Sequence, residues 1–276
     1  MGLILSVVNN KGGVSKSTTS VSLADALGRR GKRVLVLDMD SQCNTTTLLS
    51  KGGVPIRHSM YELLDPDEGD VPLQNYIHIT GCRNVVHIPN VQETASLEPK
   101  IIMTAPGSFM HLSNRLRDYA ISNFDFTIID NPPNMGAFVL CSLYLSDFVL
   151  VPVKAGSAFS VEGLLKAVQL INDVRQTGNA HLRFLRLLIT HVDKRTLASR
   201  TIVDQIHKTF PQEQIFETSI PVNTSFEKAE AASKTIFQYD PACPGAKAFR
   251  SLAGELLTLF EAGGIEDAEE KSTGTA

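Results

Sequence analysis

Short apolar runs alternate with longer segments of helical periodicity along most of the chain. Seven apolar runs predict strands, at residues 3–8, 34–37, 85–88, 126–129, 148–153, 185–190 and 215–219. Apolar residues spaced three and four apart predict helices at residues 16–30, 107–122, 158–177, 197–210 and 246–260. Strands this apolar are buried on both faces. The alternation therefore predicts an α/β fold, with a doubly wound, mostly parallel sheet and helices on both faces.

Two of these helices carry apolar stripes that we assign to the core. One stripe contains Phe109, Leu112, Leu116 and Tyr119, and the other contains Val161, Leu164, Leu165, Val168 and Ile171. Every helix of a doubly wound fold covers the sheet with one face, so a core role is favoured over a binding surface.

Two segments depart from this regular alternation. Residues 51–84 are rich in Gly, Pro and charge, with a short helical pattern at 59–64, and read as a variable insertion after the second strand. From residue 262 onward the sequence is rich in Gly, Glu, Ser and Thr without periodicity. We expect one domain over residues 1–262 and a disordered acidic tail over residues 263–276.

Composition narrows the class of protein. With 276 residues, 43% of them hydrophobic and 20% charged, the chain can bury a large core. No apolar stretch reaches the roughly 18–20 residues that span a bilayer, and no basic segment precedes the first apolar run. The cysteines have no C-x-x-C spacing, which favours reduced thiols in a cytoplasmic protein. They are Cys43, Cys82, Cys141 and Cys243.

A phosphate-binding loop is predicted where the first apolar run passes into the first helix. Gly12 and Gly13 form the turn, and Lys16, Ser17 and Thr18 open the helix. The N–H groups of such a turn and of the helix N-terminus point at an anion, and glycine permits close approach of phosphate. Lys16 would lie near the β- and γ-phosphates, with the Ser17 hydroxyl reaching Mg²⁺. Without an anion, a lysine here would oppose the helix dipole.

The loop departs from the common P-loop pattern G-x-x-x-x-G-K-[ST]. Asn10 and Ser15 occupy its glycine positions, while Lys11 stands five residues before Lys16. The pattern that fits is K-G-G-x-x-K-[ST]-[ST]. Ser15 keeps the backbone donor but adds a Cβ. The residues predicted to bind phosphate are Lys11, Gly12, Gly13, Val14, Ser15, Lys16, Ser17 and Thr18.

Three aspartates follow predicted strands, at the sheet edge where ligands collect in open α/β folds. Asp38 and Asp40 close the strand at 34–37, and Asp130 closes the strand at 126–129. One residue separates Asp38 from Asp40, so their side chains lie on opposite sides of an extended backbone and serve different purposes. Asp130 suits an Mg²⁺ site held through water. Strand-end aspartates that cap the next turn are the alternative.

These motifs together resemble the deviant Walker A ATPases of the ParA/MinD family. Residues 38–42 resemble D-x-D-P-Q, residues 130–133 resemble D-x-P-P, and residues 220–223 resemble I-P-R-N, followed by Tyr-Asp-Pro at 239–241. The resemblance runs in order over roughly residues 1–257. It implies ATP and Mg²⁺ as cofactors, with Lys11 reaching the nucleotide of a partner subunit across a homodimer.

The resemblance also assigns roles within the site. The implied catalytic residues are Lys11, Lys16, Asp40 and Asp130. Ser17, Asp40 and Asp130 would serve Mg²⁺, with Asp40 at the attacking water or the metal shell. The implied switch residues are Asp38, Pro132 and Pro133, with Gly136 as a pivot. Pro221 would stack on adenine and Asn223 would hydrogen-bond it. The family's arginine between those two is Val222 here.

A basic surface for DNA has weak support. The net charge is −3, but residues 181–250 carry ten Lys or Arg against seven Asp or Glu. Phosphate contacts supply non-specific affinity for DNA, although scattered basic residues are commonly just solvated. The candidates are Lys194, Arg195, Arg200, Lys208, Lys228, Lys234, Lys247 and Arg250.

The resemblance favours a ParA-type partition ATPase. ATP would drive a dimer that binds double-stranded DNA non-specifically on the bacterial nucleoid, and slow hydrolysis, stimulated by a centromere-binding protein, would release it. A MinD-like membrane ATPase is disfavoured, because an anionic lipid surface repels the acidic C-terminus. A metal-cluster carrier would need paired cysteines. A positioning factor for protein cargo, which does not use DNA, stays open.

Overall fold

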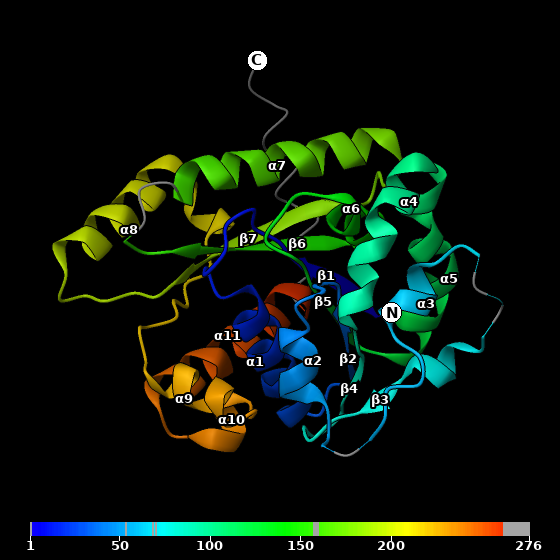
Figure 1. Ribbon diagram of the computed structural model, residues 1–276. Coiled ribbons are helices and arrows are strands. Elements are labelled where there is room, and N and C mark those ends of the chain that lie inside the picture. The colour runs from blue at the N-terminus through cyan, green and yellow to red at the C-terminus, as the bar shows by residue number, and fades with distance from the viewer. Residues whose placement is uncertain (1, 53, 68, 70, 157–159, 262–276) are drawn as a thin grey trace.

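A seven-stranded sheet forms the centre of the molecule, which is a computed structural model describing residues 2–52, 54–67, 69, 71–156 and 160–261 (Figure 1). The strands are β1 (Leu3–Val7), β2 (Val34–Asp38), β3 (His78–Ile79), β4 (Val85–Ile88), β5 (Phe126–Asp130), β6 (Phe148–Lys154) and β7 (Arg183–Thr190). Their order is β3-β4-β2-β5-β1-β6-β7. Only β3 is antiparallel to its neighbour. The predicted α/β fold with a mostly parallel sheet is confirmed.

Helices cover both faces of this sheet (Figure 1). On one face lie α1 (Lys16–Arg29), α2 (Asn44–Leu49), α9 (Ser225–Ala231), α10 (Ile236–Tyr239) and α11 (Pro244–Glu261). The other face carries α3 (Met60–Leu64), α4 (Glu98–Met103), α5 (Gly107–Asn123), α6 (Ala137–Leu145), α7 (Ser160–Thr177) and α8 (Leu197–Thr209). Short 3₁₀ turns occupy Leu73–Tyr76, Gln92–Leu97 and Gln212–Gln214.

Successive side chains along each strand point to opposite faces of the sheet, so the hydrophobic core has a part on each face. In β2, Val34 and Val36 belong to the cluster under α1 and α11, while Leu35 and Leu37 belong to the cluster on the opposite face. Successive side chains of a strand point to opposite faces, which explains why these runs are apolar throughout.

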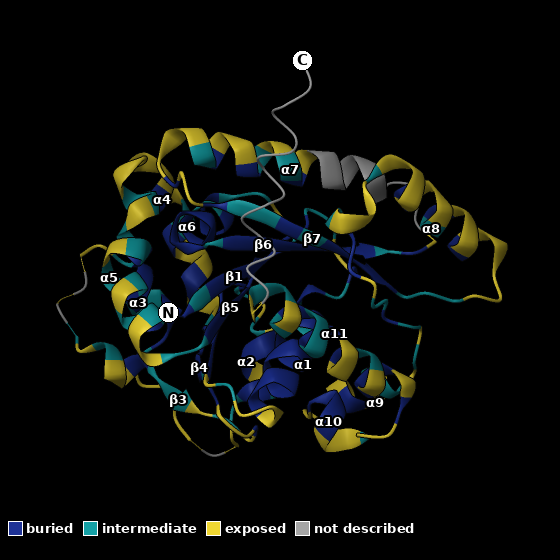
Figure 2. Cartoon of the chain, turned by 180° about the vertical axis from the view of Figure 1, so that it is seen from behind, coloured by how far each residue is buried: buried dark blue, intermediate teal, exposed yellow. Residues whose placement is uncertain are grey.

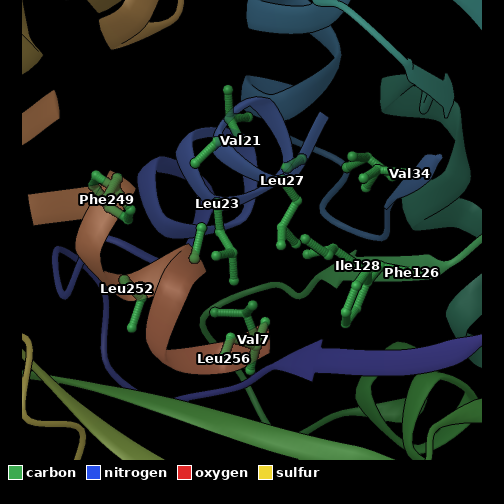
Figure 3. Close-up of a cluster of buried hydrophobic side chains, with 14 of the residues drawn as sticks. Val7, Val21, Leu23, Leu27, Val34, Phe126, Ile128, Phe249, Leu252 and Leu256 are labelled. Carbon is green, nitrogen blue, oxygen red and sulfur yellow. The ribbon is translucent and has the colours of Figure 1, made fainter. Parts of the chain in front are cut away.

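The helix α1 lies between the sheet and its neighbouring helices and is buried along most of its length (Figure 2). Figure 3 shows Leu23 and Leu27 of α1 directed toward the sheet and α11, while Val21 lies on the opposite side of the helix. From α11, Leu252 and Leu256 approach the same cluster. This packing fixes the N-terminus of α1, and with it the predicted phosphate loop, against the carboxyl end of β1.

The predicted strand at residues 215–219 is wrong. The segment runs beside β7, but it forms only isolated bridges, Leu187 with Ile215 and Val192 with Pro221. A regular ladder stops because the carboxylate of Glu255 accepts the backbone N–H groups of Glu217 and Thr218 at 2.8 and 3.0 Å. A side chain of α11 thus replaces part of the strand pairing.

The segment at residues 51–84 contributes to the core as well as to the surface. It contains α3, whose N-terminus has a capping box between Ser59 and Glu62, and the edge strand β3. Met60, Leu63 and Tyr76 are fully buried. That the segment is a variable insertion stays a prediction.

Parts of the other predictions fall outside the described residues. These are the acidic tail at 263–276, the first residues of the helix predicted at 158–177, and the side chains of Val161, Leu164 and Leu165. Of the two predicted stripes, Leu112, Leu116 and Ile171 are buried. All four cysteines are free thiols. Among the described helices, none combines the length and apolar character needed to cross a bilayer.

Burial of His87 in β4 makes the stability of the fold depend on pH. Its side chain is 1% exposed and neither ring nitrogen has a partner, so burial, and secondly the neighbouring His78, lowers its pKa to about 4. A histidine that is protonated more readily when unfolded favours the unfolded chain as pH falls below about 6.5.

We therefore expect His87→Phe to remove an acid-induced loss of about 2 kcal/mol between pH 7 and pH 5. Urea unfolding at several pH values measures it. The exposed His181, changed in the same way, serves as the control and should keep the wild-type pH dependence. An unchanged slope in His87→Phe would contradict the assignment.

Candidate functional site

A cavity of about 190 Å³ lies over the loop that joins β1 to α1. It is lined by Gly12, Gly13, Ser15, Lys16, Ser17, Thr18, Asp40, Gln42, Asn44, Leu48, Pro133 and Glu230. Gly13 has a φ of 71°, which the absence of a Cβ makes accessible. The structure therefore brings the predicted loop, one strand-end aspartate and one switch proline to a single cavity.

The ammonium group of Lys16 is held inside this loop. Its Nζ donates a hydrogen bond to the carbonyl oxygen of Lys11 at 3.1 Å, and the residue is 7% exposed. Burial lowers the pKa of Lys16, while the charges of Asp130 and Asp40 oppose that effect. The Lys11 N–H donates to the side-chain oxygen of Asn9 at 3.0 Å. A nearly buried cation beside open N–H groups is suited to bind an anion.

Asp130 lies beneath the loop and is saturated with protein donors. One carboxylate oxygen accepts from the Ser20 hydroxyl at 3.1 Å and the other from the Thr45 hydroxyl at 2.7 Å, and Ser17 also hydrogen-bonds it. Burial raises the pKa of Asp130, against the effect of these hydrogen bonds. Because the hydroxyl groups of Ser20, Thr45 and Ser17 already bind its carboxylate, Asp130 fits a role in holding Mg²⁺ through an intervening water or hydroxyl group.

Asp38 and Asp40 face different surroundings. Asp40 lines the cavity, and its carboxylate accepts the N–H of Gln42 at 3.0 Å. Asp38 is completely buried, and one of its oxygens accepts both the N–H and the hydroxyl of Thr46 at 2.7 Å. Burial, and secondly the charge of Asp130, its register partner in the sheet, raises the pKa of Asp38. Asp38 thus anchors α2, while only Asp40 reaches the cavity.

The Thr46 hydroxyl continues this contact beyond α2. It donates to Asp38 and accepts the N–H of Asn90 at 2.8 Å, and the Asn90 side-chain oxygen in turn accepts the Thr94 hydroxyl at 2.6 Å. All four residues are buried. A chain of hydrogen bonds therefore joins the end of β2, through α2, to the segment that follows β4.

The loop after Asp130 contains the predicted switch prolines. Pro132 is buried and Pro133 lines the cavity. The predicted pivot, Gly136, has a φ of −84°, which any residue adopts. The Glu98 side chain packs closely here, because an added Cβ would lie 2.3 Å from its carboxylate and would displace it. The same carboxylate accepts the N–H of Ala137 at 3.2 Å, at the first turn of α6.

A second cavity, of about 80 Å³, adjoins the first on the side of α9. Pro221 and Asn223 line it, while Ser15 and Thr18 line both cavities. The side-chain oxygen of Asn223 accepts the N–H of Ser225 at 2.9 Å, but its buried Nδ2 has no partner. An unpaired buried donor is costly, and a hydrogen-bond acceptor on a nucleotide base placed here would satisfy it. The residues present therefore fit a nucleotide along the two cavities.

His191, which is not among the predicted site residues, also lines the second cavity. It follows directly after β7 and has a φ of 53°. No sequence pattern marks this position, since a histidine after a strand belongs to no phosphate-binding motif.

The DNA candidates fall into two groups. Lys194, Arg195, Arg200 and Lys208 lie on α8 or the turn before it, and the other four lie on or near α9 and α11, in another part of the molecule (Figure 1). Arg195 forms a two-pronged ion pair with Asp193 at 2.9 Å, and Arg250 donates to the carbonyl of Pro241 at 2.5 Å. The structure does not gather the eight residues into one patch.

No group of three or more His, Cys, Asp or Glu suited to a metal ion occurs within the part of the chain that is described. Ser17, Asp40 and Asp130 offer one hydroxyl and two carboxylates near the phosphate loop. Mg²⁺ commonly retains several waters and takes few protein ligands beside substrate phosphates. This sparse set suits it.

Comparison with known proteins places the chain in a family. A family model described as an AAA domain matches residues 2–184. The chromosome-partitioning ATPase Soj of Thermus thermophilus is 34% identical over 259 residues, 93% of this chain and 96% of the relative. The chain belongs to the ParA/MinD family. Soj of Bacillus subtilis, a sporulation initiation inhibitor protein, is a ParA/MinD relative with 32% identity over 93% of this chain and 98% of its own.

Solved structures agree with membership of the ParA/MinD family. The cobyrinic acid a,c-diamide synthase of Mycobacterium smegmatis with bound ADP and magnesium superposes with a TM-score of 0.79 at 29% identity, covering 95% of this chain and 97% of that one. Apo McdA from Cyanothece superposes with a TM-score of 0.80 at 20% identity, over 93% and 100% of the two chains, and shares the fold.

Proposed function

We propose that the protein is a ParA-type partition ATPase that uses ATP and Mg²⁺. The observation that carries this proposal is a pair of neighbouring cavities that share Ser15 and Thr18 in their linings, with Lys11 and Lys16 in one loop. Membership of the family and the whole-length similarity to chromosome-partitioning ATPases support it.

Each residue of the site has a separate role in the proposed hydrolysis of ATP. The Lys16 ammonium group leaves the Lys11 carbonyl and binds the β- and γ-phosphates. Asp40, which lines the cavity, would orient the attacking water, and Mg²⁺ would be held by Ser17 directly and by Asp130 through water. When bound, Mg²⁺ would supply positive charge against the charge that develops on the phosphates. The described residues that line the cavity include no obvious strong base, so we infer that turnover is slow and that a partner protein accelerates it.

Lys11 makes the ATP-bound form a homodimer. Its backbone is fixed by Asn9 on one side and by Lys16 on the other. From that position it neutralises phosphate charge on the nucleotide of the second subunit, as an arginine finger does in other nucleotide hydrolases. The dimer binds double-stranded DNA non-specifically in the bacterial cytoplasm, and hydrolysis returns free monomers.

The test is binding to a random-sequence duplex with a slowly hydrolysed ATP analogue and with ADP, over a salt series. We expect binding only with the analogue and an affinity that falls steeply with salt, because several phosphate contacts release counterions. Lys11→Ala should bind the analogue yet lose DNA binding by at least about tenfold, since it cannot complete the dimer.

Lys51→Ala, at an exposed lysine outside the cavities, is the matched control and should behave as wild type. Equal DNA binding with ADP and with the analogue would contradict the nucleotide-dependent dimer.

The second candidate function is a positioning ATPase for protein cargo. Val222, at the position of the family's arginine, is 51% exposed, and two of the predicted basic residues, Arg195 and Arg250, are engaged by Asp193 and Pro241. If the analogue-bound protein dimerises but binds no duplex at low salt, this second function replaces the first.

A further inference from the structure

Two non-glycine residues with left-handed backbone meet where the two cavities join. Ser15 has φ 70° and ψ 37°, and His191 has a φ of 53°. The Ser15 hydroxyl lies 3.4 Å from Nδ1 of His191, and the same nitrogen lies 3.4 Å from the hydroxyl of Thr190. Thr190 itself donates to the carbonyl of Val14 in the phosphate loop at 3.2 Å. The end of β7 is therefore joined to the phosphate loop by side chains.

Such backbone is unfavourable for residues with a Cβ, and it persists where surrounding contacts impose it. In the common P-loop pattern the Ser15 position is glycine, which adopts this conformation without strain. The chain instead places a hydroxyl here, directed at a histidine that is itself in the left-handed region. Strain at two facing residues that line a binding cavity indicates that their side chains have a purpose there.

One ring nitrogen of His191, Nε2, is available for a ligand. Its Nδ1 faces the hydroxyls of Ser15 and Thr190, and no described residue hydrogen-bonds its Nε2. His191 lines the cavity that contains Asn223 and the unpaired Nδ2. Ser15 lines that cavity and the phosphate cavity together. The ring is thus located between the place of a base and the place of the β- and γ-phosphates.

We propose that His191 donates a hydrogen bond from Nε2 to the α-phosphate of the bound nucleotide, and that Ser15 is the positioning residue that orients the imidazole. This inference rests on the proposed ATPase function and assigns a contact to the same site. It explains why a serine occupies the strained position of the loop.

The charged groups that face His191 are Lys154, at the end of β6, and Glu227, on α9. Burial, and secondly Lys154, lowers the pKa of His191, and Glu227 opposes this. The free protein therefore holds His191 neutral near pH 7. A phosphate oxygen at Nε2 favours the protonated ring, so binding takes up a proton and becomes tighter as pH falls from 8 toward 6.

The experiment measures the affinity for ADP by fluorescence titration from pH 6 to pH 8. ADP is chosen so that dimerisation driven by ATP does not contribute. His191→Asn keeps a residue that tolerates left-handed backbone. We expect it to weaken ADP binding about tenfold at pH 6 and by less at pH 8. Dividing wild-type by variant affinity at each pH cancels the titration of ADP itself.

Ser15→Gly tests the positioning role. The substitution relieves backbone strain at residue 15. If the Ser15 side chain had no role, the variant would bind ADP as tightly as the wild type or more tightly, with the same pH dependence. The proposal predicts instead a smaller pH dependence than wild type, and no further loss when Ser15→Gly is combined with His191→Asn, because the two residues act as one unit. His181→Asn, at an exposed histidine before the opposite end of β7, is the matched control.

The outcomes separate the two proposals. If the wild type binds ADP but the ratio of wild-type to His191→Asn affinity does not change between pH 6 and pH 8, this inference is overturned and the proposed function is not. Additive effects in the double variant would overturn the role of Ser15. Failure of the wild type to bind ADP at any pH would overturn the proposed function, and this inference with it.

Discussion

Lys16→Ala abolishes binding of both ATP and ADP, with an expected loss of at least about a hundredfold. The reason is geometric as well as electrostatic. Lys16 is nearly buried at the first turn of α1, and its ammonium group is already within the loop, at 3.1 Å from the Lys11 carbonyl. Among the described residues that line this cavity, Lys16 is the only cation. The substitution therefore removes the positive charge that the same subunit places against the phosphates.

Isothermal titration calorimetry with each nucleotide measures this loss, and circular dichroism confirms that the variant is folded. Lys51→Ala, at an exposed lysine, controls for a general loss of positive charge. Tight ATP binding by Lys16→Ala would remove the loop from the proposed site.

Asp40→Ala binds ATP and forms the dimer, but it hydrolyses ATP at least about a hundredfold more slowly. Asp40 lines the phosphate cavity, and its carboxylate accepts the N–H of Gln42. Its loss therefore removes the group that orients water while leaving the phosphate loop intact. The expected result is a fall in kcat with little change in nucleotide affinity.

Phosphate release measures the rate, and size-exclusion chromatography with ATP measures the dimer. Asp38→Ala is the informative comparison because Asp38 lies two residues away but is fully buried and anchors Thr46. We expect Asp38→Ala to lower thermal stability, which Asp40→Ala does not. Normal turnover by Asp40→Ala would exclude Asp40 from the mechanism.

The sequence predicted the strands and helices whose apolar residues show a clear period. The prediction failed for a helix without such a period and for a segment whose strand pairing is interrupted by a distant residue. Helix α6 was not predicted because it is apolar on every side and has no stripe. The segment at 215–219 has a strand-like composition, but Glu255, from a distant helix, takes two of its N–H groups. No local sequence pattern contains this second contact.

The residues of the candidate site also fall into those that a sequence motif predicts and those that only the structure reveals. The loop, Asp40, Pro133, Pro221 and Asn223 line the two cavities, and each belongs to a recognisable motif. His191 has no motif, and Gly136 was predicted to be a pivot although its φ is ordinary and the carboxylate of Glu98 packs against it. The basic residues could not be assigned because their grouping depends on how α8, α9 and α11 lie in space.

The hydroxyl of Thr46 is shared by the carboxyl ends of two neighbouring parallel strands, β2 and β4. It donates to Asp38 and accepts from Asn90, and the Thr46 N–H binds Asp38 as well. A displacement of α2 would therefore break three buried hydrogen bonds together and leave one oxygen of the Asp38 carboxylate without its donors. The free energy lost with these bonds opposes such a displacement, so α2 fastens the segment that carries Asp40 in place beside the phosphate cavity.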